Sequence, residues 1–293
     1  MTSASALIRL ARPRQWVKNA FVAAPLFFTP EAINARNLVQ VAVALAVFCL
    51  LSSAIYVFND WCDREADRQH PSKRLRPIAS GEVSPAVGLV FALVLLLSTA
   101  ALTAFLMPRA FALYPAVYAV FSILYSLRLK HIAVLDVLIV AIGFVLRVQA
   151  GSAAIAVAPT VWIVICTFLL ALFMALAKRR DDLTRDMHDT HRPALAGYNL
   201  RFVDSALTVV LAALLVSYFV YTTDEGVIRR YGTDQLYLTA PFVAAGVLRY
   251  LQIALVEEQS GSPTDIVLTD RFLILAVLGW IVTFGWLIYG RLL

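Results

Sequence analysis

The chain has 293 residues, of which 61% are hydrophobic and only 15% are charged. Soluble globular proteins contain roughly 45–50% apolar and about 25% charged residues, so this composition excludes an ordinary soluble domain and indicates a membrane protein. The net charge of +6 suits anionic lipid headgroups or phosphorylated substrates, and makes nucleic acid a poor candidate partner.

Apolar runs divide the chain into segments that are suited to crossing a bilayer, which takes about 20 residues of helix. We predict an all-α integral membrane protein, a bundle of about nine transmembrane helices. The first and fourth runs are short and contain Pro25 and Pro115, so their limits are the least defined. The runs are 16–30, 38–58, 85–107, 111–126, 132–150, 157–177, 202–222, 237–256 and 272–289.

Basic residues predict the orientation, because cytoplasmic loops of membrane proteins carry an excess of Lys and Arg. Most of the 25 basic residues fall at the N-terminus and in the loops after the second, fourth, sixth and eighth runs. We therefore expect a multi-pass protein of the cell (inner) membrane with this basic side in the cytoplasm. The N-terminus would be cytoplasmic and the C-terminus would lie outside.

The two longest loops on the basic side share a pattern of closely spaced aspartates, then basic residues, then a proline. The first reads NDWCDREADRQHP from Asn59, and the second reads KRRDDLTRDMHDTHRP from Lys178. They follow the second and sixth runs, which favours a four-helix repeat over 14–127 and 131–256 with a final helix over 272–289. We treat residues 1–293 as a single transmembrane catalytic domain.

The first loop contains Asp60, Asp63 and Asp67 at the spacing i, i+3, i+7, which puts three carboxylates on one face of a continuing helix. Such carboxylates repel one another unless a cation binds between them. Mg²⁺ prefers oxygen ligands and usually takes one or two carboxylates together with water and substrate phosphates. The spacing predicts a magnesium diphosphate site; a solvated acidic helix end balanced by Arg64 and Arg68 explains it equally well.

The second loop repeats this geometry with Asp182, Asp186 and Asp189 at i, i+4, i+7. These carboxylates would hold a second cation or bind hydroxyl groups of a substrate. The alternative is that neighbouring basic residues, among them Lys178 and Arg179, neutralise the acids in ordinary interfacial ion pairs.

Basic residues beside the first acidic cluster suit a substrate with separated phosphates, because Lys and Arg bind phosphate directly. Lys73 and Arg76 follow the cluster in the chain, and Lys18 and Lys130 lie at the same predicted membrane surface. The alternative for any one of them is contact with anionic lipid headgroups.

Two ionisable residues interrupt the fifth run, and charges within a span are functional candidates. Asp136 and Arg147 are eleven residues apart, so on a helix they share a face but stand about 16 Å apart and do not pair. Asp136 lies near the cytoplasmic end and is predicted to reach the substrate. Arg147 lies deeper and is predicted to bind helix carbonyls or a neighbouring helix.

Together these motifs resemble those of a known family. Asn59 and the three aspartates spell N-D-x-x-D-x-x-x-D, the first signature of the UbiA superfamily of intramembrane prenyltransferases, here after the second helix. Further segments resemble the branch of decaprenyl-phosphate phosphoribosyltransferases. They are RPRQWVKN from Arg12, HPSKRLRPIASG from His70, YSLRLKH from Tyr125, GFVLR from Gly143 and AKRRDDL from Ala177.

The resemblance implies a UbiA-like fold with an active site open to the cytoplasmic side. It implies a magnesium-dependent enzyme that transfers 5-phosphoribose from 5-phosphoribose 1-diphosphate to a polyprenyl phosphate, for cell-envelope polysaccharide precursors. The catalytic residues that it implies are Asn59, Asp60, Asp63 and Asp67, and the three aspartates would bind the metal. The substrate-binding residues would be Lys18, Asn19, Lys73, Arg76, Lys130, Asp136, Lys178, Arg179, Asp182 and Asp186.

The second motif departs from that of the family's aromatic-acceptor enzymes, in which a Tyr and a Lys usually precede D-x-x-x-D. Here the preceding residues are Lys178, Arg179 and Arg180, and this basic run favours a phosphorylated second substrate.

Two other functions stay open. The first keeps the fold and the magnesium but moves a polyprenyl group from its diphosphate to an aromatic or other small acceptor. The second is a lipid or small-molecule transporter, which would need polar residues across the bilayer, whereas here they gather at one face. The expected partners are the two phosphorylated substrates and membrane lipids, and the oligomeric state is open, a homo-oligomer included.

Overall fold

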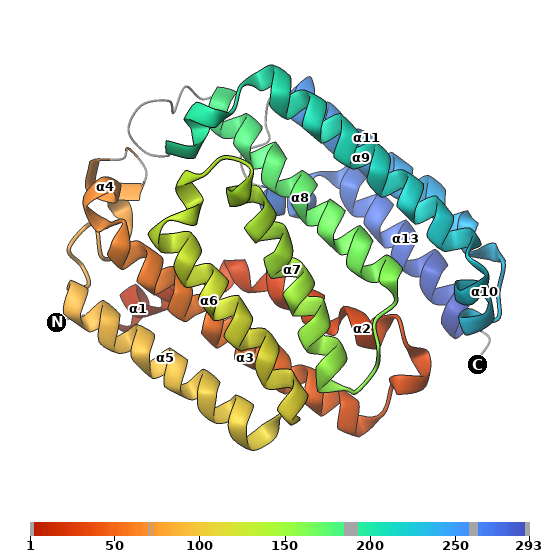
Figure 1. Cartoon of the computed structure of the whole chain (residues 1–293), viewed down its shortest axis with the longest axis horizontal. Coiled ribbons are helices and arrows are strands. Elements are labelled where there is room, and N and C mark those ends of the chain that lie inside the picture. The colour runs from red at the N-terminus through yellow and green to blue at the C-terminus, as the bar shows by residue number, and fades with distance from the viewer. Residues whose placement is uncertain (1–2, 70, 72, 185–192, 258–262, 291–293) are drawn as a thin grey trace. The chain divides into compact units, whose positions relative to one another are not determined.

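The structure is a computed structural model that describes residues 3–69, 71, 73–184, 193–257 and 263–290 (Figure 1). The described residues form helices and connecting turns without a β-strand, which confirms the all-α prediction. Eight of the described helical segments are long and apolar enough to cross a membrane. They are Ala35–Cys62, Pro85–Leu106, Arg109–Leu127, Leu135–Ala154, Val161–Thr184, Leu200–Thr223, Gln235–Leu255 and Arg271–Tyr289.

The helices form two compact units, each with its own internal contacts. The first unit contains α1 (Ala4–Ala11), η1 (Pro13–Ala23), α2 (Ala24–Phe27), η2 (Pro30–Ala32), α3 (Ala35–Cys62), α4 (Arg64–Gln69), η3 (Lys73–Leu75), α5 (Pro85–Leu106), η4 (Arg109–Ala112), α6 (Leu113–Leu127), η5 (Leu129–His131) and α7 (Leu135–Ala154). The second contains α8 (Val161–Thr184), η6 (Pro193–Gly197), α9 (Leu200–Thr223), α10 (Glu225–Tyr231), η7 (Gln235–Thr239), α11 (Ala240–Leu255), α12 (Pro263–Thr269) and α13 (Arg271–Tyr289).

The boundary between the two units falls after Pro159, so α7 belongs with the first unit. The predicted repeat divides the chain earlier, between residues 127 and 131, and assigns that helix to the second half. The duplicated four-helix unit stays a prediction.

The first predicted run, 16–30, is not one α-helix, and this is the difference between nine expected helices and eight. It consists of the 3₁₀ helix η1 followed by the short helix α2, with Pro13 and Pro25 in their first turns. Proline lacks an N–H group, so it fits the first turn of a helix and interrupts a longer one. A window of hydrophobicity does not detect such a break.

These short pieces nevertheless follow α3 along its length in the opposite direction. Ser53 Oγ donates to the carbonyl oxygen of Ala11 at 2.8 Å, which places the start of the segment beside the C-terminal half of α3. Near the other end, Asn37 Nδ2 donates to the carbonyl oxygen of Ala32 at 2.8 Å. Residues 11–32 therefore run back from the end of α3 to its beginning.

Gly151 lets η1 approach α7 closely. A Cβ atom at this position would lie 1.9 Å from the carbonyl oxygen of Val22, so a larger residue requires the backbone to move. Val22 packs with Phe48 and Ala150 in one buried apolar cluster, which joins η1, α3 and α7. In the most apolar window of α7, 61% of the residues are buried, against 11% in that of α5, so other parts of the chain cover α7 far more than α5.

Replacing Gly151 by Ala should lower the free energy of unfolding by about 3 kcal/mol, the upper end of the range for an overpacked site, because the new methyl group meets backbone. Gly285→Ala in α13 is the matched control, since a Cβ atom there meets no atom of the described residues within 4 Å. It should leave stability unchanged or raise it by up to about 1 kcal/mol. Thermal unfolding of both variants in detergent checks this, and equal melting temperatures would contradict the close contact.

Candidate active site

The end of α3 carries the first aspartate motif. The helix ends at Cys62, the N–H group of Asp63 bonds to the carbonyl oxygen of Asn59 at 2.9 Å, and α4 begins at Arg64. The N–H group of Asp67 in turn bonds to the carbonyl oxygen of Asp63 at 2.8 Å, so helical spacing continues across the break. Asp60 and Asp67 are buried, whereas the side chain of Asp63 is 30% exposed.

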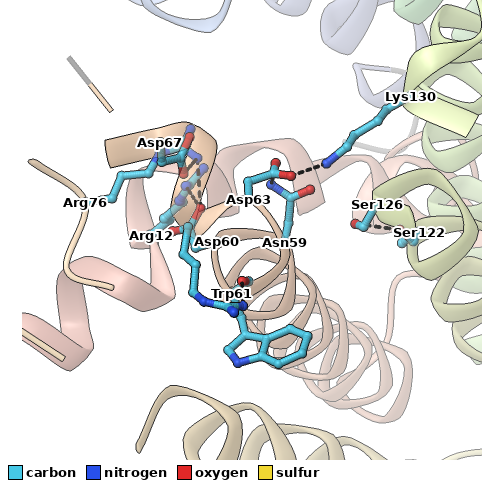
Figure 2. A network of polar contacts seen from close by, with 11 residues as sticks. Arg12, Asn59, Asp60, Trp61, Asp63, Asp67, Arg76, Ser122, Ser126 and Lys130 are labelled. Carbon is cyan, nitrogen blue, oxygen red and sulfur yellow. Dashed lines mark hydrogen bonds and ion pairs between the residues drawn. The ribbon is translucent and has the colours of Figure 1, made fainter. Parts of the chain in front are cut away.

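Asp60 meets two guanidinium groups at one of its oxygens. Its Oδ1 accepts hydrogen bonds from Arg12 Nη2 at 2.5 Å and from Arg76 Nη1 at 3.0 Å (Figure 2). Its Oδ2 is buried and has no hydrogen-bond partner among the described residues. A buried carboxylate oxygen without a donor is unfavourable, so this atom is available to a ligand of the site.

Arg76 joins two of the aspartates. The same nitrogen, Nη1, donates to Asp60 Oδ1 and, at 2.6 Å, to Asp67 Oδ2 (Figure 2). Backbone hydrogen bonds from Arg76 to Lys73 and from Ser80 to Arg76 close turns on both sides of it, which fixes the position of its backbone. One guanidinium nitrogen therefore lies between two buried carboxylates that belong to α3 and α4.

Asp63 is held by two other predicted site residues. Lys130 on η5 forms an ion pair with Asp63 Oδ1, and Asn59 Nδ2 donates to Asp63 Oδ2 at 3.1 Å (Figure 2). The structure thus brings together six of the predicted site residues, namely Asn59, the three aspartates, Arg76 and Lys130.

Arg12 also contacts the site, although it is not among the site residues predicted from the sequence. It separates α1 from η1 in a left-handed backbone conformation, with φ 53° and ψ 58°, which is strained for any residue but glycine. Its guanidinium lies 5.1 Å from the centre of the Tyr56 ring and reaches Asp60. In the sequence, the feature that could have identified Arg12 is its position as the first residue of the motif RPRQWVKN.

The residues at this site fit a magnesium ion held by few protein ligands. Within the described ranges, no three His, Cys, Asp or Glu side chains are placed to hold a metal ion together. Asp60 Oδ2 is nevertheless a buried hard oxygen that no described residue bonds to, and Mg²⁺ usually binds one or two carboxylates together with substrate phosphates. The donor set therefore suits a metal that arrives with a phosphorylated ligand.

Asn19 lies in a different network, around Arg147. Arg147 donates to Asn19 Oδ1 at 2.8 Å, to the carbonyl oxygen of Gly143 at 2.9 Å and to the Tyr118 hydroxyl at 2.9 Å. This confirms the expectation that Arg147 binds a helix carbonyl and neighbouring helices. The Asn19 amide group donates to Ser52 Oγ on α3, so the structure uses Asn19 inside the bundle and does not bring it to the aspartates.

The other predicted residues of the first unit lie on separate elements. Lys18 on η1 and Lys73 on η3 are half-buried, and Asp136 is buried in the first turn of α7. Their roles in substrate binding stay predictions.

The second aspartate motif lies at the end of α8 in the second unit. Lys178 is exposed, whereas Arg179 and Asp182 are buried and bonded to each other, Nη1 to Oδ2, at 2.5 Å. This ion pair agrees with the alternative prediction for Asp182, in which a neighbouring basic residue neutralises the acid. Asp186 and Asp189 lie outside the described residues.

Arg180 connects the same helix end to two other helices. Its Nε donates to Asp204 Oδ1 on α9 at 2.7 Å, and its Nη1 donates to the carbonyl oxygen of Ala254 near the end of α11 at 2.7 Å. Arg180 therefore fixes the helix end that carries Arg179 and Asp182.

Comparison with known proteins assigns the fold and the family. Residues 19–265 match the UbiA prenyltransferase family. The decaprenyl-phosphate phosphoribosyltransferase of Mycolicibacterium smegmatis is 36% identical, covering 97% of this chain and 93% of the relative. That of Corynebacterium glutamicum is 35% identical, covering 95% and 85%.

Among solved structures, a UbiA homolog from Archaeoglobus fulgidus bound to DMAPP and Mg²⁺ has a TM-score of 0.71 to this chain. The alignment covers 97% of this chain and 99% of that one, at 20% sequence identity. This likeness confirms the predicted UbiA-like fold.

Arg147→Met should lower the free energy of unfolding by about 3 kcal/mol, because the Asn19 oxygen and the Tyr118 hydroxyl lose a charged donor inside the bundle. Arg14→Met is the control, since Arg14 is exposed on η1 and the substitution removes the same charge. Denaturant or thermal unfolding in detergent measures both. An equal effect of the two substitutions would show that the buried network adds no stability.

Proposed function

The chain belongs to the UbiA prenyltransferase family, and we propose that it transfers 5-phosphoribose from 5-phosphoribose 1-diphosphate to a polyprenyl phosphate, with release of diphosphate. Relatives named decaprenyl-phosphate phosphoribosyltransferase match 95–97% of the chain at 35–36% identity. With its apolar spanning helices, the chain is a multi-pass membrane enzyme of the transferase class.

The observation that carries the proposal is the convergence of acidic and basic side chains at the end of α3. Arg12, Arg76 and Lys130 come from three separate segments, and each contacts an aspartate of the first motif. A protein that binds a sugar with a diphosphate at one end and a phosphate at the other needs carboxylates to hold the metal ion and positively charged side chains to bind the phosphates. The lipid phosphate adds a further anionic group.

The chemical step exchanges one bond at C1 of the ribose. The bond from C1 to the diphosphate oxygen breaks, and the diphosphate leaves with the electron pair. Positive charge develops on the ribose, and an oxygen of the lipid phosphate then bonds to C1. Bound Mg²⁺ would neutralise the departing diphosphate, the type of electrostatic stabilisation that usually dominates such transfers.

The aspartate motif would hold the metal. Asp60 offers Oδ2, while at the same helix end Asp67 contacts Arg76 and Asp63 points toward Lys130 (Figure 2). Asn59 orients Asp63 through its amide hydrogen bond. Fixed carboxylates of this kind would hold a metal diphosphate in one orientation. Holding a reactant in the reactive orientation lowers the barrier to transfer.

The basic residues would bind the phosphates. Arg76 and Lys130 already lie against the carboxylates, and Lys18 and Lys73 lie in segments that lead to the same site. In the second unit, Asp182 would bind a ribose hydroxyl group or a second metal ion, with Lys178 and Arg179 as its basic neighbours.

We further propose that the end of the bundle that carries the first motif faces the cytoplasm, because basic residues gather there. Eight long helices alone would return the chain to its starting side, so a C-terminus on the outside requires residues 12–32 to cross as well. The course of that segment along α3 supports a ninth crossing.

A transfer assay on the purified protein tests the reaction. Labelled 5-phosphoribose 1-diphosphate, polyprenyl phosphate and Mg²⁺ should move label into the lipid phase. A second assay, run in parallel, offers polyprenyl diphosphate and an aromatic acid as the two substrates. Activity with the second pair alone would replace the proposal by an aromatic prenyltransferase with the same fold.

The metal assignment predicts that Asp60→Asn and Asp63→Asn reduce turnover by at least about a thousandfold, a loss of about 4 kcal/mol of transition-state stabilisation. Glu65→Gln is the matched control, because Glu65 lies in the same segment with a side chain that is 66% exposed. EDTA should stop the reaction and added Mg²⁺ restore it. Full activity in either aspartate variant would remove that residue from the metal site.

A further inference from the structure

Arg76 stands in the position of a shared cation. Its Nη1 lies 3.0 Å from an oxygen of Asp60 and 2.6 Å from an oxygen of Asp67, and both of these carboxylates are buried. A divalent ion shared by the same two carboxylates would need the space between those oxygens. Two positive groups at such short separation repel each other, so the guanidinium and the ion exclude one another there.

The surroundings of Arg76 allow it to leave. Its side chain is 24% exposed, and it belongs to the turn after η3, outside the spanning helices. Asp60 would keep a partner on departure, because Arg12 also bonds to Oδ1 and is held over the Tyr56 ring. Asp67 would lose the contact with Arg76, and its charge would then be available to a metal ion.

We propose that Arg76 is the internal counterion of the metal site, and that it exchanges its carboxylate partners for a phosphate oxygen when metal and diphosphate bind. The inference rests on the metal site of the proposed function. It predicts that the two ligands help each other to bind: metal alone must displace a buried ion pair and binds weakly, whereas metal with diphosphate gives the displaced guanidinium a new charged acceptor. Binding of the two is then coupled, and the coupling is reciprocal.

If Arg76 is a counterion, removing its charge changes the affinity for metal in the opposite direction from the change expected for a purely structural or phosphate-binding residue. Removing the charge of Arg76 frees Asp67 and leaves Asp60 with Arg12 as its one cationic neighbour among the described residues, so it should strengthen the binding of a metal ion alone. Without its guanidinium, residue 76 can no longer move from the carboxylates to a phosphate oxygen. The same change should therefore weaken the effect of diphosphate on metal affinity. A residue that only stabilised the loop would weaken metal binding in both conditions.

Mn²⁺ binding to the purified full-length chain in detergent, followed by electron paramagnetic resonance with and without inorganic diphosphate, measures this coupling. In the unaltered protein we expect diphosphate to tighten Mn²⁺ binding by about tenfold or more, within the usual range for coupled sites. Arg76→Gln should bind Mn²⁺ alone about tenfold more tightly and respond little to diphosphate. Arg74→Gln, which removes the same charge from an exposed neighbour, should behave like the unaltered protein.

Several results would overturn the inference. Unchanged or weaker binding of Mn²⁺ alone by Arg76→Gln would do so, and so would equal effects of Arg74→Gln and Arg76→Gln. If Arg76→Gln does not fold, the unaltered protein still decides, because Mn²⁺ binding that is equally tight without diphosphate contradicts a displaced counterion. Absence of Mn²⁺ binding under every condition would instead reject the metal site itself, and the inference with it.

Discussion

A carboxylate that is 1% exposed at the end of a membrane helix has to be neutralised, and the first unit is arranged around that requirement. Arg12 meets Asp60 across 48 residues of sequence and Arg76 meets it across 16. The first contact brings the start of η1 to the end of α3. The second folds the chain after α4 back over the motif, so that the charges of the site and the path of the backbone depend on the same ion pairs.

Arginine also neutralises acidic side chains at the end of α8. In the second unit, Asp182 is bonded to Arg179, and Asp204 is bonded to Arg180, which also satisfies a carbonyl oxygen of α11. The buried Arg147 is also satisfied by hydrogen bonds, but its acceptors are uncharged. They are oxygens of Asn19, Gly143 and Tyr118. Arginine is suited to this task since its planar group offers five donors and keeps its charge when buried.

This arrangement also reconciles two descriptions of the aspartate motif that the sequence leaves equally open. The acids are balanced by basic residues, as expected for a structural helix end, yet one oxygen of Asp60 has no hydrogen-bond partner in the part of the chain that the structure describes. A site that awaits a metal with its phosphate ligand needs both properties, because unbalanced carboxylates would be unstable inside the protein and fully satisfied ones would bind nothing.

The sequence by itself determined the apolar runs, the family motif and the behaviour of Arg147, because hydrophobicity, spacing along a helix and the cost of a buried charge are local properties. Tertiary structure decided the rest. It broke the run 16–30 into η1 and α2, set the unit boundary after Pro159, moved Asn19 into the bundle and added Arg12 to the site. These outcomes depend on contacts between residues far apart in the chain, such as Lys130 with Asp63 across 67 positions, which form only when helices pack and bring distant side chains within hydrogen-bonding distance.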